Sequence, residues 1–243
     1  MSDFKKIDTL LKMQPRASDA PLSEEIEAYA LCKSELEGLI VVVSDLLNDS
    51  SRIYAGGFAA EMGLDGYETE NSIWEKRIFE LMPEAQRQEK FKAELRFFNS
   101  LRRMPKQLRR YHYLASHLRF ITCGGKEIDV VHTMYYVYAD DVVRFAVCTY
   151  GPLSFGFTGK SVIVNSRTGV TEPLTRESDA EILTRRELQT LSLIAAGRKS
   201  REIASLLSIS QHTVNRHRQE IMIKLQAKSS LEAINIAKSL GIL

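Results

Sequence analysis

The chain has 243 residues, of which 44% are hydrophobic and 26% charged, and its formal net charge is +2. This length accommodates two ordinary domains, and the hydrophobic content is sufficient for a sizeable core in the larger one. The longest apolar run, Leu39 to Val43, is far shorter than the roughly 20 residues of a membrane-spanning helix. The N-terminus lacks the continuous apolar stretch of a signal peptide, so we expect a cytoplasmic protein that does not contact a membrane.

The residue types that carry enzymatic or metal chemistry are not grouped in this sequence. Cys32, Cys123 and Cys148 are odd in number and form no CxxC pair, which favours reduced thiols over a disulfide framework or a zinc site. His112 and His117 are five residues apart on a predicted strand and therefore point to opposite faces. No nucleophile, base and orienting group come together, and there is no glycine-rich phosphate loop. We expect no metal, no cofactor and no enzymatic activity.

Residues 1–164 carry the periodicities of an α+β domain. Helices are predicted at residues 23–38, 58–62 and 84–103. Strands are predicted at residues 39–44, 52–55, 113–122, 127–138 and 142–150, with turns at 48–51, 124–125 and 140–141. The basic residues of helix 84–103 fit a solvated face better than a phosphate or lipid site. The expected fold is a five-stranded antiparallel sheet with flanking helices.

This element order, two strands, helices and three strands, resembles a PAS-type sensor domain. The resemblance is carried by Arg52-Ile53-Tyr54, Ala60-Glu61-Met62-Gly63, Leu81-Met82-Pro83-Glu84 and Gly124-Gly125-Lys126-Glu127. It implies a cavity between the sheet and its helices that takes a small molecule. Tyr135, Tyr136 and Tyr138 fit either the wall of such a cavity or an ordinary core. Residues 165–182 are polar, contain Gly169 and Pro173, and are predicted to be the interdomain linker.

Residues 183–243 contain closely spaced helix start and stop signals. Thr184 and Glu187 have the spacing of a capping box at the start of a first helix, and Gly197 suits its end. Ser200 is expected to cap a second, short helix. Ser208-Ile209-Ser210 is the predicted connection, and Ser210 caps a third helix at about 211–226. The pattern predicts an all-α domain that contains a helix-turn-helix.

The third helix has two different sides. Val214, Ile221 and Leu225 form a narrow core-facing stripe. The outer side carries a donor-rich set that can pair with base edges in a major groove: His212, Asn215, Arg216, Gln219 and Ile223. The alternative is an ordinary solvated face. Charge favours DNA, because residues 183–243 hold ten Lys or Arg against four Glu, a net +6, which leaves −4 for residues 1–182.

The C-terminal segment resembles the LuxR-type, or GerE-type, helix-turn-helix of bacterial transcription regulators. The matching residues are Leu183-Thr184, Arg186-Glu187, Leu191, Gly197, Ser200, Glu202-Ile203-Ala204, Leu207, Ile209-Ser210, Thr213-Val214, His217, Ile221, Lys224-Leu225 and Ala233. The resemblance implies base contacts from Asn215, Arg216 and Gln219, and contacts to the DNA backbone from Thr213, His217 and Lys224. Lysine is frequent in the family where this chain has Asn215. A fourth helix, predicted from Leu231 to Leu240 and stopped by Gly241, would mediate dimerisation.

Together these features predict a cytoplasmic, dimeric regulator that binds specific double-stranded operator DNA and senses a small molecule or protein signal. One alternative is that residues 1–164 bind no ligand and serve only to dimerise or to contact RNA polymerase. A second alternative is a sigma-like factor, although no second promoter-binding region is recognisable. A cavity of a few hundred Å³ between sheet and helices distinguishes the sensor from the ligand-free module.

Overall fold

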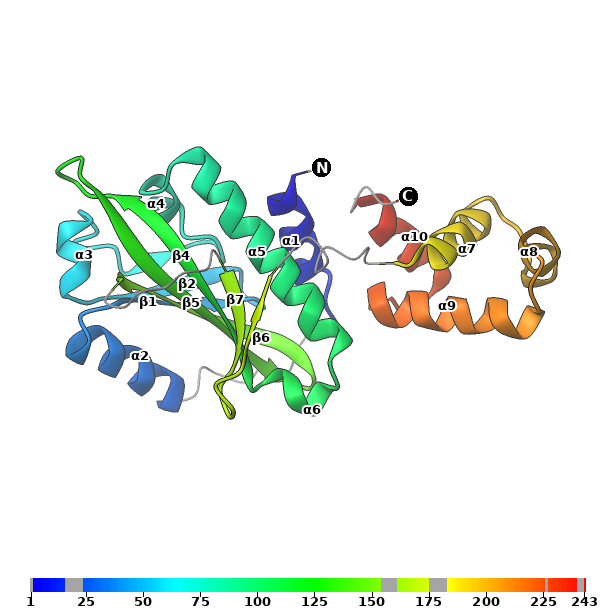
Figure 1. Ribbon diagram of the computed structural model, residues 1–243, viewed down its shortest axis with the longest axis horizontal. Coiled ribbons are helices and arrows are strands. Elements are labelled where there is room, and N and C mark those ends of the chain that lie inside the picture. The colour runs from blue at the N-terminus through cyan, green and yellow to red at the C-terminus, as the bar shows by residue number, and fades with distance from the viewer. Residues whose placement is uncertain (1, 16–23, 154–160, 175–182, 226, 240–242) are drawn as a thin grey trace. The chain divides into compact units, whose positions relative to one another are not determined.

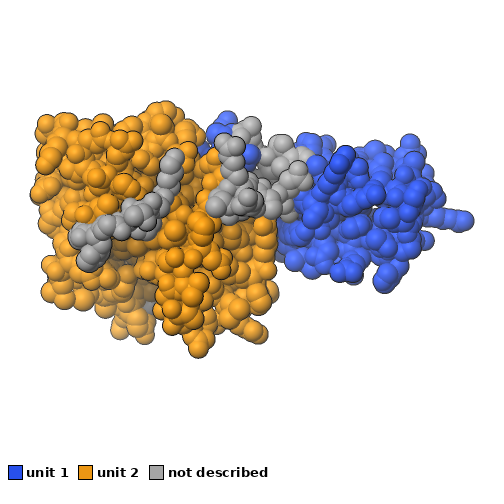
Figure 2. All heavy atoms as spheres, viewed as in Figure 1, with its two compact units in different colours: residues 1–15, 175–243 blue, residues 16–174 orange. Residues whose placement is uncertain are grey.

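The computed structural model describes residues 2–15, 24–153, 161–174, 183–225, 227–239 and 243. The chain divides into two compact units (Figure 2). The larger is formed by residues 16–174 and the smaller by residues 1–15 together with residues 175–243. The predicted helix start at Ser23, helix end at Gln226 and stop from Leu240 to Gly241 lie outside the described residues.

The larger unit is built on an antiparallel sheet that has eight strands in the described residues (Figure 1). In order across the sheet these are β3 (Thr69–Glu70), β2 (Ser50–Ala55), β1 (Ile40–Asp45), β6 (Val142–Pro152), β5 (Glu127–Ala139), β4 (His112–Ile121), β7 (Ser161–Asn165) and β8 (Thr171–Pro173). The five predicted strands are present and adjacent, as β2-β1-β6-β5-β4. The prediction of a five-stranded sheet is wrong, because β3 extends one edge and β7 and β8 extend the other.

The hairpin of β7 and β8 also corrects the start of the predicted linker. Residues 165–173 of the expected 165–182 connection belong to the sheet, and residues 175–182 lie outside the described part. The Asn165 side chain accepts hydrogen bonds from the N–H groups of Arg167 and Thr168 at 3.0 and 3.2 Å, and Gly169 has a φ of 71°. A polar Asx turn between two very short strands has the composition of a linker, which is why the sequence pattern misled.

Helices cover both faces of this sheet (Figure 1). On one face, α2 (Glu24–Leu36) places Ala30 against Val43 and Phe145. On the other, α5 (Glu84–Arg103) stacks Phe97 on Tyr136, with ring centroids 5.6 Å apart. The remaining helices are short: α3 (Gly57–Glu61), α4 (Lys76–Glu80) and α6 (Lys106–Arg109) in this unit, and the ten-residue α1 (Asp3–Lys12) in the smaller unit. The predicted helices at 58–62 and 84–103 are confirmed, whereas α1, α4 and α6 were not predicted.

Aspartates form the tight turns of the sheet. Asp140 and Asp141 have positive φ angles of 50° and 64°, as the predicted turn between β5 and β6 requires. Asp45 ends β1, and its side chain accepts the N–H groups of Leu47 and Asn48, both at 2.9 Å, while it ion-pairs with Arg144. Asp45 is therefore a turn residue. None of the described helices is long and apolar enough to span a bilayer.

Candidate functional site

The described part of the smaller unit contains four helices after residue 183 (Figure 1). They are α7 (Arg185–Ala195), α8 (Ser200–Leu207), α9 (Gln211–Leu225) and α10 (Ser230–Ser239). Thr184 caps α7: its hydroxyl accepts the Glu187 N–H at 3.3 Å, and the Glu187 carboxylate accepts the Thr184 N–H at 2.7 Å. Gly197, with a φ of 77°, follows the end of α7. The predicted capping box and the glycine stop are both confirmed.

The start of α8 differs by one residue from the prediction. Ser200 is the first residue of the helix, and Lys199 is its N-cap. The Lys199 N–H donates to the Glu202 carboxylate at 2.8 Å, so the glutamate satisfies the cap and no hydroxyl is needed there. Ser200 instead accepts a hydrogen bond from the Arg218 side chain at 3.2 Å.

The connection from α8 to α9 has the tight geometry of a helix-turn-helix. Ser208 takes a left-handed conformation, with φ 52° and ψ 46°, and ends α8. The Ser210 hydroxyl accepts the Thr213 N–H at 3.0 Å and caps α9, as predicted. Ile209 packs between the helices against a buried cluster that includes Ile203 and Val214. This connection holds α9 firmly against α8.

The two sides of α9 are as the sequence pattern predicts. Val214, Ile221 and Leu225 are at most 2% exposed. The opposite side is exposed to solvent and comprises His212, Asn215, Arg216, Gln219 and Ile223. Asn215, Arg216 and Gln219 therefore lie on one accessible surface of a helix that is held at its start by the turn. These three side chains carry amide and guanidinium donors of the kind that can pair with base edges.

The three residues expected to contact the DNA backbone are placed differently from one another. Thr213 and His217 are half-buried, and the Thr213 hydroxyl hydrogen-bonds the Ser210 hydroxyl at 2.8 Å. Lys224 places its ammonium 2.7 and 2.8 Å from the two carboxylate oxygens of Glu187. Lys224 thus ties α9 to α7 within the domain. Its charge is already paired before any phosphate is met.

Glu187 connects the cap of α7 with this ion pair. The residue is 4% exposed. Burial alone would raise the pKa of Glu187, but the hydrogen bonds from Lys224 and from the Thr184 N–H outweigh burial and hold that pKa below its ordinary value. The carboxylate therefore stays charged, and it satisfies both a helix N-terminus and a lysine.

Arg218 has a structural role that charge counting missed. Its guanidinium donates to the Ser200 hydroxyl at 3.2 Å and to the Ser230 hydroxyl at 2.9 Å. It therefore joins α8, α9 and α10. The sequence shows the two acceptors only as serines at helix starts. Serine is common at such positions as a helix cap, so these serines do not predict the contact with Arg218. Arg216, two residues earlier, points to the exposed side instead.

The fourth helix begins with a serine cap. The Ser229 hydroxyl accepts the Glu232 N–H at 3.2 Å. Ala233, Ile236 and Ala237 are buried at 1% exposure or less, whereas Leu231 is 69% exposed. One face of α10 therefore packs within the domain, while Leu231 is accessible.

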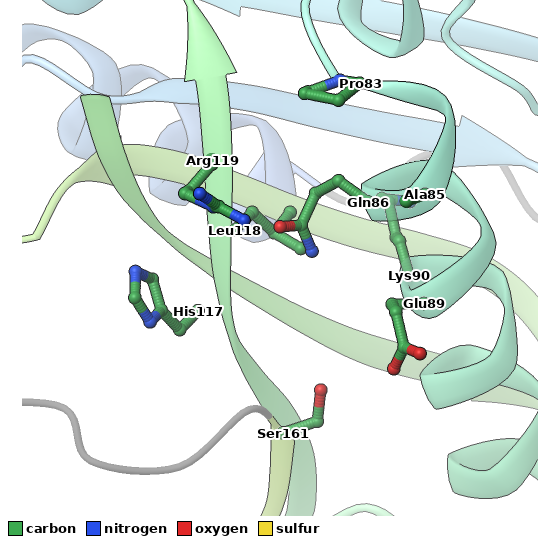
Figure 3. Close-up of a pocket in the computed structure, with 9 residues that line it drawn as sticks. All are labelled: Pro83, Ala85, Gln86, Glu89, Lys90, His117, Leu118, Arg119 and Ser161. Atoms are coloured by element: carbon green, nitrogen blue, oxygen red, sulfur yellow. The ribbon is translucent and has the colours of Figure 1, made fainter. Parts of the chain in front are cut away.

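The larger unit contains a pocket of about 450 Å³ between the first half of α5 and strand β4 (Figure 3). Gln86 extends from α5 towards Leu118 and Arg119 of β4, whereas His117 lies on the other side of that strand (Figure 3). Lys90, which is 2% exposed, lies at the inner wall. This volume lies within the range of small-molecule sites.

Buried polar groups surround Lys90 on the inner face of the sheet. Lys90 ion-pairs with Glu94, and its ammonium lies 4.9 Å from the centre of the Phe79 ring. His132 is fully buried and stacks on Tyr150 at 4.8 Å. Within the described part of the chain, neither ring nitrogen of His132 has a hydrogen-bond partner, and the Tyr150 hydroxyl has none either. Such unsatisfied groups cost roughly 1–3 kcal/mol each unless water or a ligand meets them.

The pKa values of two buried groups follow from this environment. Burial raises the pKa of Glu75 to about 7, although the positive charge of Lys90 limits the rise. Burial, together with Lys90, lowers the pKa of His132 well below its ordinary value, so the ring is neutral. The described residues contain no group of three or more metal-ligating side chains.

Comparison with known proteins identifies the C-terminal segment. Residues 181–237 match the family described as bacterial regulatory proteins, luxR family. Over 67 residues the chain is 43% identical to the uncharacterized response regulatory protein YgeK of Escherichia coli K12. The aligned residues are 28% of this chain and 46% of YgeK. The chain is also 42% identical over 64 residues to the transcriptional regulatory protein DesR of Bacillus subtilis. These residues are 26% of this chain and 32% of DesR. The chain spans less than half the length of these relatives, and the match shows a LuxR-type helix-turn-helix domain.

Solved structures align over most of the chain but with low scores. A VqmA dimer of Vibrio cholerae, determined without its target DNA, is 17% identical and covers 91% of this chain and 89% of its own, with a TM-score of 0.33. SdiA of Escherichia coli is 15% identical, and the alignment covers 92% of this chain and 93% of SdiA, with a TM-score of 0.25. These scores are too low to assign the fold of the larger unit.

Proposed function

We propose that this protein is a transcription regulator that binds specific double-stranded DNA as a dimer and responds to a small molecule bound in its larger unit. The observation that carries the DNA-binding part is the exposed surface of α9 in a domain that matches the luxR family. Asn215, Arg216 and Gln219 on that surface are proposed to read bases. Thr213 and His217 are proposed to contact the DNA backbone. Lys224 is proposed to contact it as well, which requires its ammonium to leave or share its ion pair with Glu187.

The identities of the three base-reading residues suggest what they recognise. Asparagine and glutamine can pair bidentately with adenine, and arginine with guanine. The net charge of +6 between residues 183 and 243 supports attraction to phosphates. In a dimer, two copies of α9 would enter successive major grooves about one helical turn apart. Leu231, exposed on α10, is available for a contact between two such domains.

Two features of the larger unit support a small-molecule signal over a ligand-free module. The first is the pocket of about 450 Å³ between α5 and β4. The second is the buried, stacked pair of His132 and Tyr150, whose polar side-chain atoms have no hydrogen-bond partner in the described residues. The adjacent strands β2-β1-β6-β5-β4, interrupted in sequence by helices, also support the PAS-like interpretation. A filled, fully satisfied interior would instead favour a unit that only dimerises or contacts RNA polymerase.

The test of DNA reading is the substitution Arg216→Ala, measured against an operator selected from a random DNA pool. Loss of a bidentate contact to guanine should cost about 1–3 kcal/mol of specific binding and leave binding to unrelated DNA nearly unchanged. Mobility-shift titrations at one fixed salt concentration measure both. Arg201→Ala, which removes an exposed arginine from α8, is the matched control and should not change the ratio of specific to unrelated binding. An unchanged ratio in Arg216→Ala would contradict base reading by this residue.

A further inference from the structure

A second pocket, of about 370 Å³, lies in the larger unit where α5 gives way to α6. Its walls come from α6, from the residue after it, and from the last part of β5 with the following turn. Strand β5 is paired with β4 only as far as Met134, yet it continues to Ala139. The end of β5 is therefore not covered by β4. The α6 segment lies beside it and completes the pocket.

The charges around this pocket are unbalanced. Lys106 ion-pairs with Asp141 at 2.8 Å. Arg109 and Arg110 also line the pocket, and their charges act on the same Asp141 carboxylate, so one acidic group faces three basic ones. The Arg109 guanidinium donates to two backbone carbonyls, both at 3.2 Å, which fix its position without neutralising its charge. Lys106, Arg109 and Arg110 outnumber Asp141, so the lining of the pocket carries a net positive charge.

Two buried donors, one in the lining of the pocket and one beside Arg109, have no hydrogen-bond partner in the described part of the chain. Tyr136 is 6% exposed and lines the pocket, and its hydroxyl has no hydrogen-bond partner. One terminal nitrogen of the Arg102 guanidinium, which lies 5.7 Å from the Phe98 ring, is also buried without a partner. Burial and the neighbouring Arg109 charge lower the pKa of Arg102 to about 10. Buried donors are normally satisfied, so these point to an absent acceptor.

We propose that this pocket binds a small anion with several acceptor oxygens, either a phosphate group or a polycarboxylate. Arg109 and Arg110 supply the charge, and Tyr136 supplies a neutral donor. Arginine suits this role because its planar guanidinium donates two parallel hydrogen bonds to such oxygens. An anion would also offset the repulsion among the clustered arginines. The site lies at the opposite end of α5 from the pocket in Figure 3 and does not depend on DNA binding.

The experiment is isothermal titration calorimetry of the full-length protein with inorganic phosphate and, separately, with succinate. Sodium chloride at equal ionic strength gives the background. Saturable binding of at least one of the two anions is expected. Arg110→Ala should weaken that binding about tenfold or more, and Tyr136→Phe, which removes only the hydroxyl, about threefold or more. Which anion binds distinguishes a phosphate ligand from a polycarboxylate.

Two control variants locate the binding. Arg103→Ala removes an exposed arginine from the end of α5, outside the pocket, and Arg216→Ala removes one from the exposed face of α9. Both should retain wild-type anion affinity. Circular dichroism confirms folding, and Arg110 is exposed, so its variant serves even where Tyr136→Phe is less stable. The proposal is overturned if neither anion gives saturable binding, or if Arg110→Ala binds as tightly as the wild type.

Discussion

Arg216 and Arg218 are two residues apart on α9 and have different surroundings. Arg218 is held by the hydroxyls of Ser200 and Ser230, whereas Arg216 is exposed. A helix turns by about 100° per residue, so neighbours at this spacing face different directions. The charge count treats the two arginines alike, and only their positions separate a scaffold residue from a candidate base contact.

The buried carboxyl of Glu75 in the larger unit is expected to make the stability of the protein depend on pH. Its pKa is raised to about 7 from an ordinary value of 4.5, so the folded protein binds more protons than the unfolded chain between these values. The Glu75 contribution to stability is therefore present below about pH 4.5 and is lost as the pH rises to about 7. Glu75→Gln should remove this loss and be more stable than the wild type at pH 8, by up to about 3 kcal/mol.

Urea unfolding at several pH values between 5 and 8 measures this difference. Glu80→Gln, an exposed carboxyl on α4, is the matched control and should follow the wild-type profile. Other acidic groups, such as Glu187, have lowered pKa values and give the opposite trend, which the comparison with wild type cancels. A Glu75→Gln profile parallel to that of the wild type would show that Glu75 does not titrate in this range.

At the scale of elements, the sequence predicts the long, strongly patterned segments well. The limits of α5 are predicted at both ends, because its apolar spacing is regular and Pro83 precedes it. Several short elements, such as β3, β8 and α4, were not predicted, because they are too short to show periodicity; α3, also short, was found from the glycines at its start. For the binding surface, the faces of α9 were predictable from spacing, whereas the pairing of Lys224 with Glu187, 37 residues apart, depends on tertiary packing.

The ion pair between Glu187 of α7 and Lys224 of α9 is expected to stabilise the smaller unit. Lys224→Met should leave the buried Glu187 carboxylate without its cation and destabilise the smaller unit by about 1–3 kcal/mol. The double variant Glu187→Gln/Lys224→Met should recover part of the loss, because no unpaired charge remains. Urea unfolding followed by circular dichroism, arranged as a double-mutant cycle, measures the coupling. If Lys224→Met weakens DNA binding without any change in stability, its main role is phosphate contact.

At the scale of the whole molecule, charge and chemistry are divided between the two units. Residues 183–243 carry a net +6, and residues 1–182 carry −4. The surface proposed to read DNA lies in the smaller unit, and both pockets lie in the larger one. A ligand in the larger unit can influence DNA binding only by binding more tightly to one arrangement of the protein than to another. The proposed signal thus requires occupancy of the pocket between α5 and β4.

The last prediction tests that occupancy with a substitution that fills the pocket. Ala85 lines it from α5 and is exposed, so Ala85→Phe adds a ring at the pocket without disturbing the core. Mass spectrometry of the native wild-type protein should show a retained small molecule, and Ala85→Phe should lose it. Gln88→Phe places the same ring on an exposed position of α5 outside the pocket and should retain the molecule. Equal retention by both variants would place the ligand elsewhere, and its absence from the wild-type protein would favour a larger unit that dimerises or contacts RNA polymerase without a ligand.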